Sequence, residues 1–216
     1  MEAISKTSKI ERIIKLTLLV IVGSILITIS AKIKIPFYPV PMTMQTFVIL
    51  LIGITCGYKI GLATVTLYLL EGIFGLPVFA NSPEKGIGIA YFIGPTMGYL
   101  VGFLIAVYFA GLFKYDKGLI NTFLKLIFSV SFIYIIGIIW LGTLIGWDKP
   151  VFKLGAEPFL LAELFKILLL YAKIYEYMRY IRKFHDSDIM YHKIYSIINH
   201  VRDGHNNVQH YCTPTF

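Results

Sequence analysis

Charged side chains are scarce in this sequence. Of its 216 residues, 15% are charged and 57% are hydrophobic, and the mean hydropathy is +0.74, whereas an average soluble domain carries about 25% charged residues. Apolar runs recur from Ile13 to Leu170 with short polar interruptions. Because about 20 apolar residues cross the roughly 30 Å of a bilayer core, the sequence predicts an all-α polytopic membrane protein, a bundle of about six transmembrane helices.

Cysteines and the common catalytic motifs are also sparse or missing. The two cysteines, Cys56 inside an apolar run and Cys212 near the end, have a spacing that predicts neither a disulfide nor a metal cluster. The sequence has no phosphate-binding loop, no zinc-binding His-Glu-x-x-His helix and no Gly-x-Ser-x-Gly nucleophile elbow. We therefore expect no cofactor, no metal site and no catalytic residues, and any ATP that drives activity must bind another subunit.

The apolar segments set the expected helices and domains. They predict helices over residues 13–31, 43–58, 60–76, 95–113, 119–145 and 158–176. The first segment resembles a secretory signal, but no small-residue cleavage site follows it, so we interpret it as a retained helix. The resulting division is a transmembrane substrate-binding domain over residues 1–176 and an atypical polar tail over residues 177–216.

The net charge of +8 reflects topology rather than nucleic-acid binding. With the N-terminus in the cytoplasm, the predicted cytoplasmic segments up to residue 183 hold twelve Lys and Arg, and the outer loops hold five. This distribution follows the positive-inside rule. We therefore expect a multi-pass protein of a bacterial inner membrane with a cytoplasmic N-terminus, surrounded by the lipid bilayer and with no nucleic-acid partner.

The predicted outer loops differ from the inner turns. Residues 32–41, 75–94 and 146–157 form loops that are longer and richer in Pro and Gly than the turns on the inner side. Three prolines between Pro36 and Pro41 fix the backbone and remove hydrogen-bond donors. This stiff loop is either a lid over an outward-facing site or an ordinary connector, and the residues alone leave both interpretations open.

Small residues repeat along the fourth predicted helix. Gly94, Gly98, Gly102, Ala106 and Ala110 recur at every fourth position, which places them along one stripe of the helix. In lipid, small side chains let helix backbones approach closely and gain dispersion contacts. The stripe predicts close packing, either inside the bundle or, as a second interpretation, against a partner.

Three ionisable residues lie inside predicted spans: Glu71, Glu163 and Lys166. A charge at mid-membrane costs about 2.5 to 3.5 kcal/mol on insertion scales, so each needs a partner or a cavity. Glu163 and Lys166 are three residues apart, which places them on one helix face within pairing distance. They form either a structural salt bridge or a polar receptor for an anionic ligand. Glu71 is either a third polar contributor, close to the loop that holds Asn81, or a group at the membrane interface.

Three segments carry a resemblance to a known family. Residues 35–46 read IPFYPVPMTMQT, residues 72–80 read GIFGLPVFA and residues 94–100 read GPTMGYL. In this order and spacing they resemble the BioY family, over about residues 13–170. The resemblance implies a biotin-binding S component of an energy-coupling-factor (ECF) transporter, which captures biotin at the outer side for import. It also implies a transmembrane coupling subunit and ATPase subunits as partners, and no enzymatic activity.

The resemblance also implies the binding residues. These are Thr43, Gln45, Asn81, Glu163 and Lys166, to which we add Tyr91, Phe92 and Tyr99 as our own hypothesis of apolar walls. The family's acidic-x-x-Lys pair falls on Glu163 and Lys166, and Asn81 matches a polar position in the loop after helix three. We expect Lys166 to meet the biotin carboxylate and Glu163 and Asn81 to meet other polar atoms of the ligand, with the aromatic residues as apolar walls. Which polar group meets which end of biotin stays open.

Two features depart from the family. Ser24 and Thr28 stand where members present an Ala-x-x-x-Ala surface of the first helix to the coupling subunit. After Leu170 a polar tail holds all five histidines, at spacings that fit no metal-ligand motif. The tail indicates a cytoplasmic amphipathic or disordered segment, or a frame-damaged end of an inactive gene copy.

Two other classes of function are left for experiment to separate. One is a membrane-embedded enzyme that acts on a small or lipid-linked substrate, with Glu71 and Glu163 as acid and base. The other is an inert scaffold in which Glu163 and Lys166 form only a bridge. Tight binding of biotin without turnover separates a solute-binding subunit from both.

Overall fold

A computed structural model describes residues 2–36, 38–115, 118–176 and 179 of the chain. Its elements are α1 (Glu2–Lys32), β1 (Lys34–Ile35), β2 (Met42–Thr43), α2 (Gln45–Ile73), α3 (Gly88–Phe92), α4 (Met97–Leu112), α5 (Leu119–Ile145) and α6 (Val151–Gly155), and residues 157–176 form a last helix. Contacts divide the chain after Tyr171, and everything described below lies in the part that ends there. Of the predicted tail, residues 177–216, only Arg179 is among the described residues.

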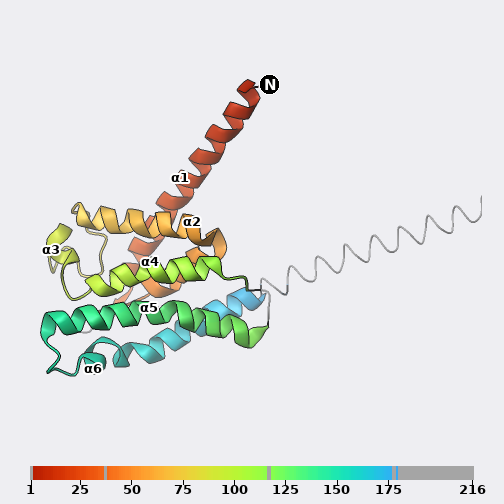
Figure 1. Cartoon of the computed structure of the whole chain (residues 1–216). Coiled ribbons are helices and arrows are strands. Elements are labelled where there is room, and N and C mark those ends of the chain that lie inside the picture. Colours follow the sequence, from red (N-terminus) through yellow and green to blue (C-terminus); the bar gives the residue numbers. More distant parts are fainter. Residues whose placement is uncertain (1, 37, 116–117, 177–178, 180–216) are drawn as a thin grey trace, which may run out of the picture. The chain divides into compact units, whose positions relative to one another are not determined.

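The predicted all-α membrane bundle is confirmed. Ile10–Lys32, Gln45–Ile73 and Ile120–Ile145 are long and apolar enough to cross a membrane, and Met97–Leu112 is a shorter apolar helix. Together with the last helix they account for the predicted apolar segments (Figure 1). The short helices α3 and α6 were not predicted, because five residues are too few to show a helical period.

The helix α2 folds back on itself at Gly57. This residue has φ 79° and ψ 167°, a conformation that residues with a side chain rarely adopt. The arms on either side lie against each other, because Gln45 Nε2 donates to the Tyr68 hydroxyl at 2.8 Å and a Cβ on Gly61 would lie 3.5 Å from Gly53 Cα. The predicted pair of helices joined by a tight turn is thereby confirmed, although its second arm ends at Ile73 rather than at residue 76.

The Pro-rich loop after α1 contains a short strand pair that sequence reasoning did not predict. Strands β1 and β2 are antiparallel, with Lys34 opposite Thr43 and Ile35 opposite Met42. The amide of Met44 also donates to the carbonyl of Ile33 at 3.2 Å. These bonds fold the loop back, so that Thr43 is placed directly before α2.

Helix α4 packs between α2 and α5 through its small residues (Figure 1). A Cβ on Gly98 would lie 2.6 Å from the carbonyl oxygen of Ile136, and one on Gly102 would lie 2.7 Å from Ile133 Cα. Ala110 lies against Gly53 in the first arm of α2. The stripe of small residues therefore packs inside the bundle, which was the first of its two interpretations, rather than against a partner.

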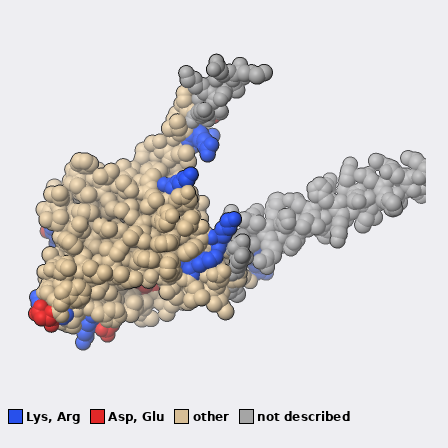
Figure 2. Space-filling model, in the orientation of Figure 1, with Lys and Arg blue, Asp and Glu red and all other residues tan. Residues whose placement is uncertain are grey.

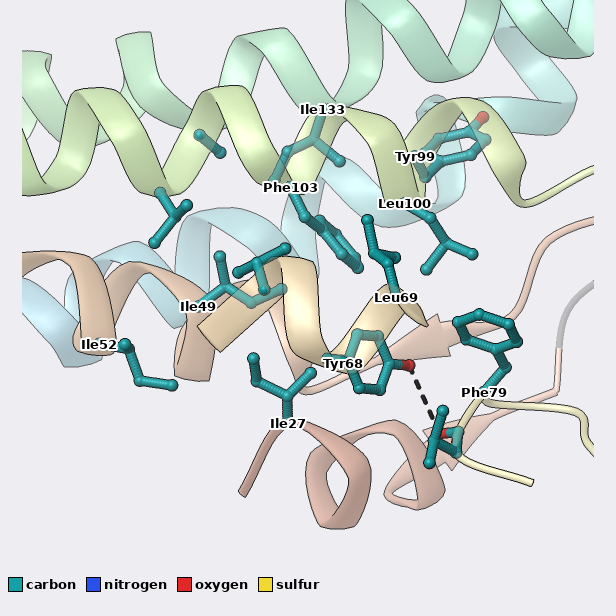
Figure 3. Close-up of a cluster of buried hydrophobic side chains, with 14 of the residues drawn as sticks. Ile27, Ile49, Ile52, Tyr68, Leu69, Phe79, Tyr99, Leu100, Phe103 and Ile133 are labelled. Atoms are coloured by element: carbon teal, nitrogen blue, oxygen red, sulfur yellow. Dashed lines mark hydrogen bonds between the residues drawn. The ribbon is translucent and has the colours of Figure 1, made fainter. Parts of the chain in front are cut away.

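The hydrophobic core joins α1, α2, α4 and α5. Figure 3 shows Leu100 and Phe103 of α4 pointing toward Tyr68 and Leu69 of α2. The hydroxyl of Tyr68 lies 3.4 Å from the carbonyl oxygen of Val78, which it meets as a donor. On the face shown in Figure 2, the charged side chains gather at opposite sides of the bundle and leave an uncharged belt between them. Such a belt suits contact with lipid.

Candidate ligand-binding site

A pocket opens among the helices at the end of the bundle that carries the strand pair. Its empty space is about 560 Å³, counting the part that is open to solvent. Its lining comes from the strand loop, α2, the loop after α2, α3, α4, α5 and the last helix: Val40, Pro41, Met42, Thr43, Gln45, Thr46, Phe79, Ala80, Tyr91, Thr96, Tyr99, Leu100, Phe103, Ile133, Tyr134, Phe159, Glu163 and Lys166.

The polar centre of the pocket is an ion pair on the last helix. Lys166 Nζ lies 2.6 Å from Glu163 Oε1, and the two side chains are only 5% and 7% exposed. The separation of three residues brings both groups to one helix face, as the sequence predicts. Charges that are buried to this extent are costly unless they are paired and hydrogen-bonded, so the surrounding donors and acceptors decide what the pair does.

Lys166 directs its hydrogen bonds to protein atoms. Besides Glu163 Oε1, its ammonium donates to the carbonyl of Thr43 at 2.6 Å and to Thr46 Oγ1 at 3.0 Å. An ammonium has three N–H donors, so all three have acceptors within the chain. The hydroxyl of Thr46 in turn donates to Glu163 Oε1 at 2.9 Å. Lys166 therefore ties the last helix to the start of α2.

The other oxygen of Glu163 is not used in this way. Oε2 is buried and accepts no hydrogen bond of normal length from the described part of the chain, although the hydroxyl of Tyr134 is near enough to act as a hydrogen-bond donor to the carboxylate. Leaving a buried acceptor without a donor costs about 1 to 3 kcal/mol, and more when the group is charged. A ligand N–H that reached this oxygen would supply a donor for it.

The structure brings most of the predicted site residues together. Thr43, Gln45, Tyr91, Tyr99, Glu163 and Lys166 all line the pocket. Phe92 lies behind the wall, where its ring contacts Phe79 with 6.2 Å between centroids.

Asn81 and Glu71 lie away from the lining. The side-chain oxygen of Asn81 accepts from Lys34 Nζ at 3.0 Å, and its backbone amide donates to the Tyr91 hydroxyl at 3.2 Å. Glu71 accepts a hydrogen bond from the hydroxyl of Ser24 in α1. Neither residue contributes to the pocket wall, so Glu71 is not a third polar group of this site.

The polar ends of the pocket's aromatic and amide residues are already engaged. Tyr99 donates its hydroxyl hydrogen to the carbonyl of Gly155 at 2.8 Å. Burial raises the pKa of Tyr91, so its phenol stays neutral and accepts from Asn81. Gln45 donates to Tyr68 and accepts from the hydroxyl of Thr43 at 3.1 Å. These side chains present mainly carbon surface to a ligand.

Sequence reasoning missed several lining residues. Thr46 is the last residue of the segment 35–46 that carries the family resemblance, and its place directly after Gln45 could have marked it as a pocket residue. Tyr134 is a tyrosine in an otherwise aliphatic run, and Phe159 opens the last helix. An apolar or aromatic residue in a membrane helix gives no sign of which face it occupies, so the sequence could not separate these residues from core or lipid-facing ones.

Ser24 and Thr28 of α1, which occupy the positions of the family's Ala-x-x-x-Ala surface, lie on the side of the helix that faces the bundle. Ser24 is fully buried and Thr28 is half-buried, and a Cβ on Gly23 would lie 2.6 Å from Thr64 Cγ2 of α2. The exposed side of α1 carries large aliphatic residues instead, such as Val22 and Ile25. Ser24 is therefore not exposed on the outer face of α1, and docking of a partner through Ser24 and Thr28 stays in doubt.

These features define a class of protein: a multi-pass helical membrane protein with a partly open pocket that contains a buried ion pair. The chain belongs to the BioY family, whose model matches residues 4–183. It is 36% identical over 141 residues to the probable biotin transporter BioY of Pyrococcus horikoshii, covering 65% of this chain and 82% of the relative. It is 35% identical over 144 residues to the biotin transporter BioY of Thermotoga maritima, covering 66% and 83%.

A solved structure agrees with these relatives. It is the S-component for biotin from an ECF-type ABC transporter, and it matches with a TM-score of 0.63 and 25% sequence identity. The match covers 80% of this chain and 93% of that chain. The likeness therefore extends over nearly the whole of that S-component.

Proposed function

We propose that this chain is the biotin-binding membrane subunit, or S component, of an ECF-type vitamin transporter. Family membership and the biotin S-component whose fold it shares support this function. The observation that carries it in this chain is the pocket with the buried pair Glu163 and Lys166, in which Glu163 Oε2 is the one carboxylate oxygen not engaged by Lys166 or Thr46. The relatives reported above are named as transporters, and nothing in the pocket supports the enzyme alternative.

The hydrogen bonds of the pair favour one orientation of biotin. Biotin carries two N–H donors on its ureido ring and an anionic carboxylate on a flexible tail. The N–H groups of Lys166 already have protein acceptors, whereas Glu163 Oε2 accepts no hydrogen bond of normal length from the described residues. The ureido ring would therefore meet Glu163, with the tail toward the open end of the pocket. Lys166 would act by compensating the charge of Glu163 and fixing its position, rather than by meeting the biotin carboxylate as the sequence suggested.

The remaining site residues fit this pose as walls and supports. Tyr91 and Tyr99 would pack their rings on the apolar bicycle and thioether of biotin, because their hydroxyls are bound elsewhere. Thr43 and Gln45 would hold the strand loop over the ligand. Asn81 would act behind the wall and not as a direct ligand contact.

Location and partners follow from the same proposal. The pocket end would face outward and the N-terminus inward, as the distribution of basic residues favours. The membrane would be the bacterial inner membrane, and a coupling subunit with ATPase subunits would supply the energy for import, because this sequence contains no phosphate-binding loop.

The function is tested by equilibrium dialysis of radiolabelled biotin against the detergent-purified chain. We expect saturable binding of one biotin per chain, with chemically unchanged biotin recovered after denaturation. Recovery of an altered product would favour the enzyme alternative. Absence of saturable binding to a monodisperse chain would rule out the proposed function.

The orientation is tested with two biotin derivatives. Biotin methyl ester, which lacks the tail charge, is expected to retain most of the affinity, whereas biotin methylated on a ureido nitrogen is expected to bind much more weakly. The reverse order of affinities would place the carboxylate at the ion pair and overturn this pose.

A further inference from the structure

Two lysines outside the pocket hold part of its wall in place. Lys32, the last residue of α1, donates from Nζ to the carbonyls of Phe79 at 2.8 Å and Ser82 at 2.7 Å. Lys34, in β1, donates from Nζ to the carbonyl of Ala80 at 2.8 Å and to Asn81 Oδ1 at 3.0 Å. Every residue of the segment 79–82 thus contributes one oxygen to a lysine ammonium.

This segment needs such donors. It forms turns rather than a helix or strand. The carbonyls of Phe79 and Asn81 accept from the amides of Ser82 and Lys85, whereas those of Ala80 and Ser82 have no backbone donor among the described residues, and carbonyls without partners are costly when buried. An ammonium meets several carbonyls at once through charge-assisted hydrogen bonds, which are stronger than neutral ones. Two ammonium groups side by side also repel each other, so this arrangement is stable only while the oxygens of residues 79–82 stay in place between them.

The segment matters because it forms part of the pocket wall. Phe79 and Ala80 line the pocket. The ring of Phe79 is 1% exposed and stacks on Tyr91, with 5.2 Å between centroids and 16° between planes. A shift of the segment would therefore move two aromatic rings that lie against the ligand space.

Lys34 also connects this wall to the opposite one. Across the strand pair it faces Thr43, whose carbonyl accepts a hydrogen bond from Lys166 at 2.6 Å. One continuous set of contacts thus runs from the buried ion pair through Thr43 and Lys34 to Ala80 and Asn81. An exposed ion pair with Glu84 at 3.2 Å adds to the outer end of this set, although such pairs contribute little on their own.

We propose that Lys32 and Lys34 are positioning residues for ligand binding, which lock residues 79–82 onto the strand pair so that the two segments form one cover over the pocket. The cover then slows the escape of bound ligand more than it affects entry. Asn81 acts through Lys34 and does not touch the ligand. The inference rests on the proposed ligand-binding function, and it adds residues that the pocket lining does not contain.

The kinetic test measures association and dissociation of biotin by stopped flow for the full-length chain in detergent. For Lys32→Met and for Lys34→Met we expect the dissociation rate to rise about tenfold and the association rate to change less than about threefold, because each variant loses two or more charge-assisted hydrogen bonds. Lys34→Arg is expected to recover part of the effect, because it retains donors. Lys153→Met, an exposed lysine on α6, is the matched control and should behave as wild type.

A double-mutant cycle tests the role assigned to Asn81. If Asn81 acts through Lys34, the effects of Asn81→Ala and Lys34→Met on the dissociation rate should not add, as is usual for residues in one hydrogen-bond network. Fully additive effects would show that Asn81 meets the ligand independently and would overturn this part of the proposal.

A measurement on the protein without ligand tests the positioning role of Lys32 and Lys34 independently of biotin binding. In the free protein the amides of Ser82, Lys85 and Gly86 are hydrogen-bonded within the loop, and hydrogen–deuterium exchange reports how often they open. We expect faster exchange of these amides in Lys34→Met and no change in Lys153→Met. Unchanged exchange and unchanged biotin dissociation in both Lys32→Met and Lys34→Met would overturn the positioning role of the two lysines, whereas failure of wild-type protein to bind biotin would overturn only the proposed function.

Discussion

The ammonium of Lys166 meets one oxygen of Glu163, at 2.6 Å, and the other oxygen of that carboxylate accepts no hydrogen bond from the described residues. A pair that served only to hold helices together would be expected to satisfy both oxygens, because buried polar groups in folded proteins nearly always have partners. The proposed contact between Glu163 and a ligand N–H rests on this one-sided pairing.

The first prediction separates the structural role of the pair from its binding role. Lys166→Met should destabilise the chain by about 3 to 5 kcal/mol, because it leaves Glu163 buried without its counter-charge. Lys166→Met combined with Glu163→Met should recover much of that stability and still bind no biotin. Thermal unfolding in detergent and biotin binding measure the two properties. A stable double variant that binds biotin like wild type would reduce the pair to a simple bridge.

The second prediction concerns Thr46. Thr46→Val keeps the shape of the side chain and removes the hydroxyl that accepts from Lys166 and donates to Glu163. We expect biotin affinity to fall by about tenfold, because the carboxylate of Glu163 and the ammonium of Lys166 each lose a partner that holds them in position. Thr66→Val, at an exposed position in the same helix, is the control. Equal affinities of the two variants in a binding titration would contradict the assignment of Thr46 to the polar centre.

The third prediction distinguishes the ring of Tyr99 from its hydroxyl. The hydroxyl holds the carbonyl of Gly155 at the end of α6, and the ring lines the pocket. Tyr99→Phe should therefore cost about 1 kcal/mol of stability and leave biotin affinity nearly unchanged. Tyr99→Ala should lower affinity as well, because it removes the apolar wall. Strong loss of affinity in Tyr99→Phe would mean that the hydroxyl meets the ligand directly.

Much of the fold was predictable because a membrane-spanning helix requires a long run of apolar residues, which is visible in the sequence. The turn at Gly57 was also predictable, since a glycine followed by Tyr58 and Lys59 interrupts an apolar run. The strand pair was not, because two residues per strand show no alternation. The prediction of helix ends erred by a few residues, as at Ile73, where turn geometry rather than hydrophobicity stops the helix.

Some residues of the site could be predicted from the sequence and others could not. Glu163 and Lys166 were predictable because a charge in an apolar helix has few explanations. Asn81 and Glu71 were placed near the site by their position in the sequence, which does not reveal the direction of a side chain. Only the structure shows that Asn81 turns toward Lys34 and that Glu71 turns toward Ser24.

The central claim is that Glu163 offers its free oxygen to an N–H of biotin, and Glu163→Gln tests it most directly. In this variant the amide oxygen must turn to Lys166, which leaves an NH₂ group facing the N–H of the ligand. Calorimetric titration of the purified chain with biotin should show about a 30-fold loss of affinity, or about 2 kcal/mol, while Glu157→Gln, an exposed control on the same helix, should bind like wild type. Undiminished biotin affinity in a folded Glu163→Gln chain would contradict the account.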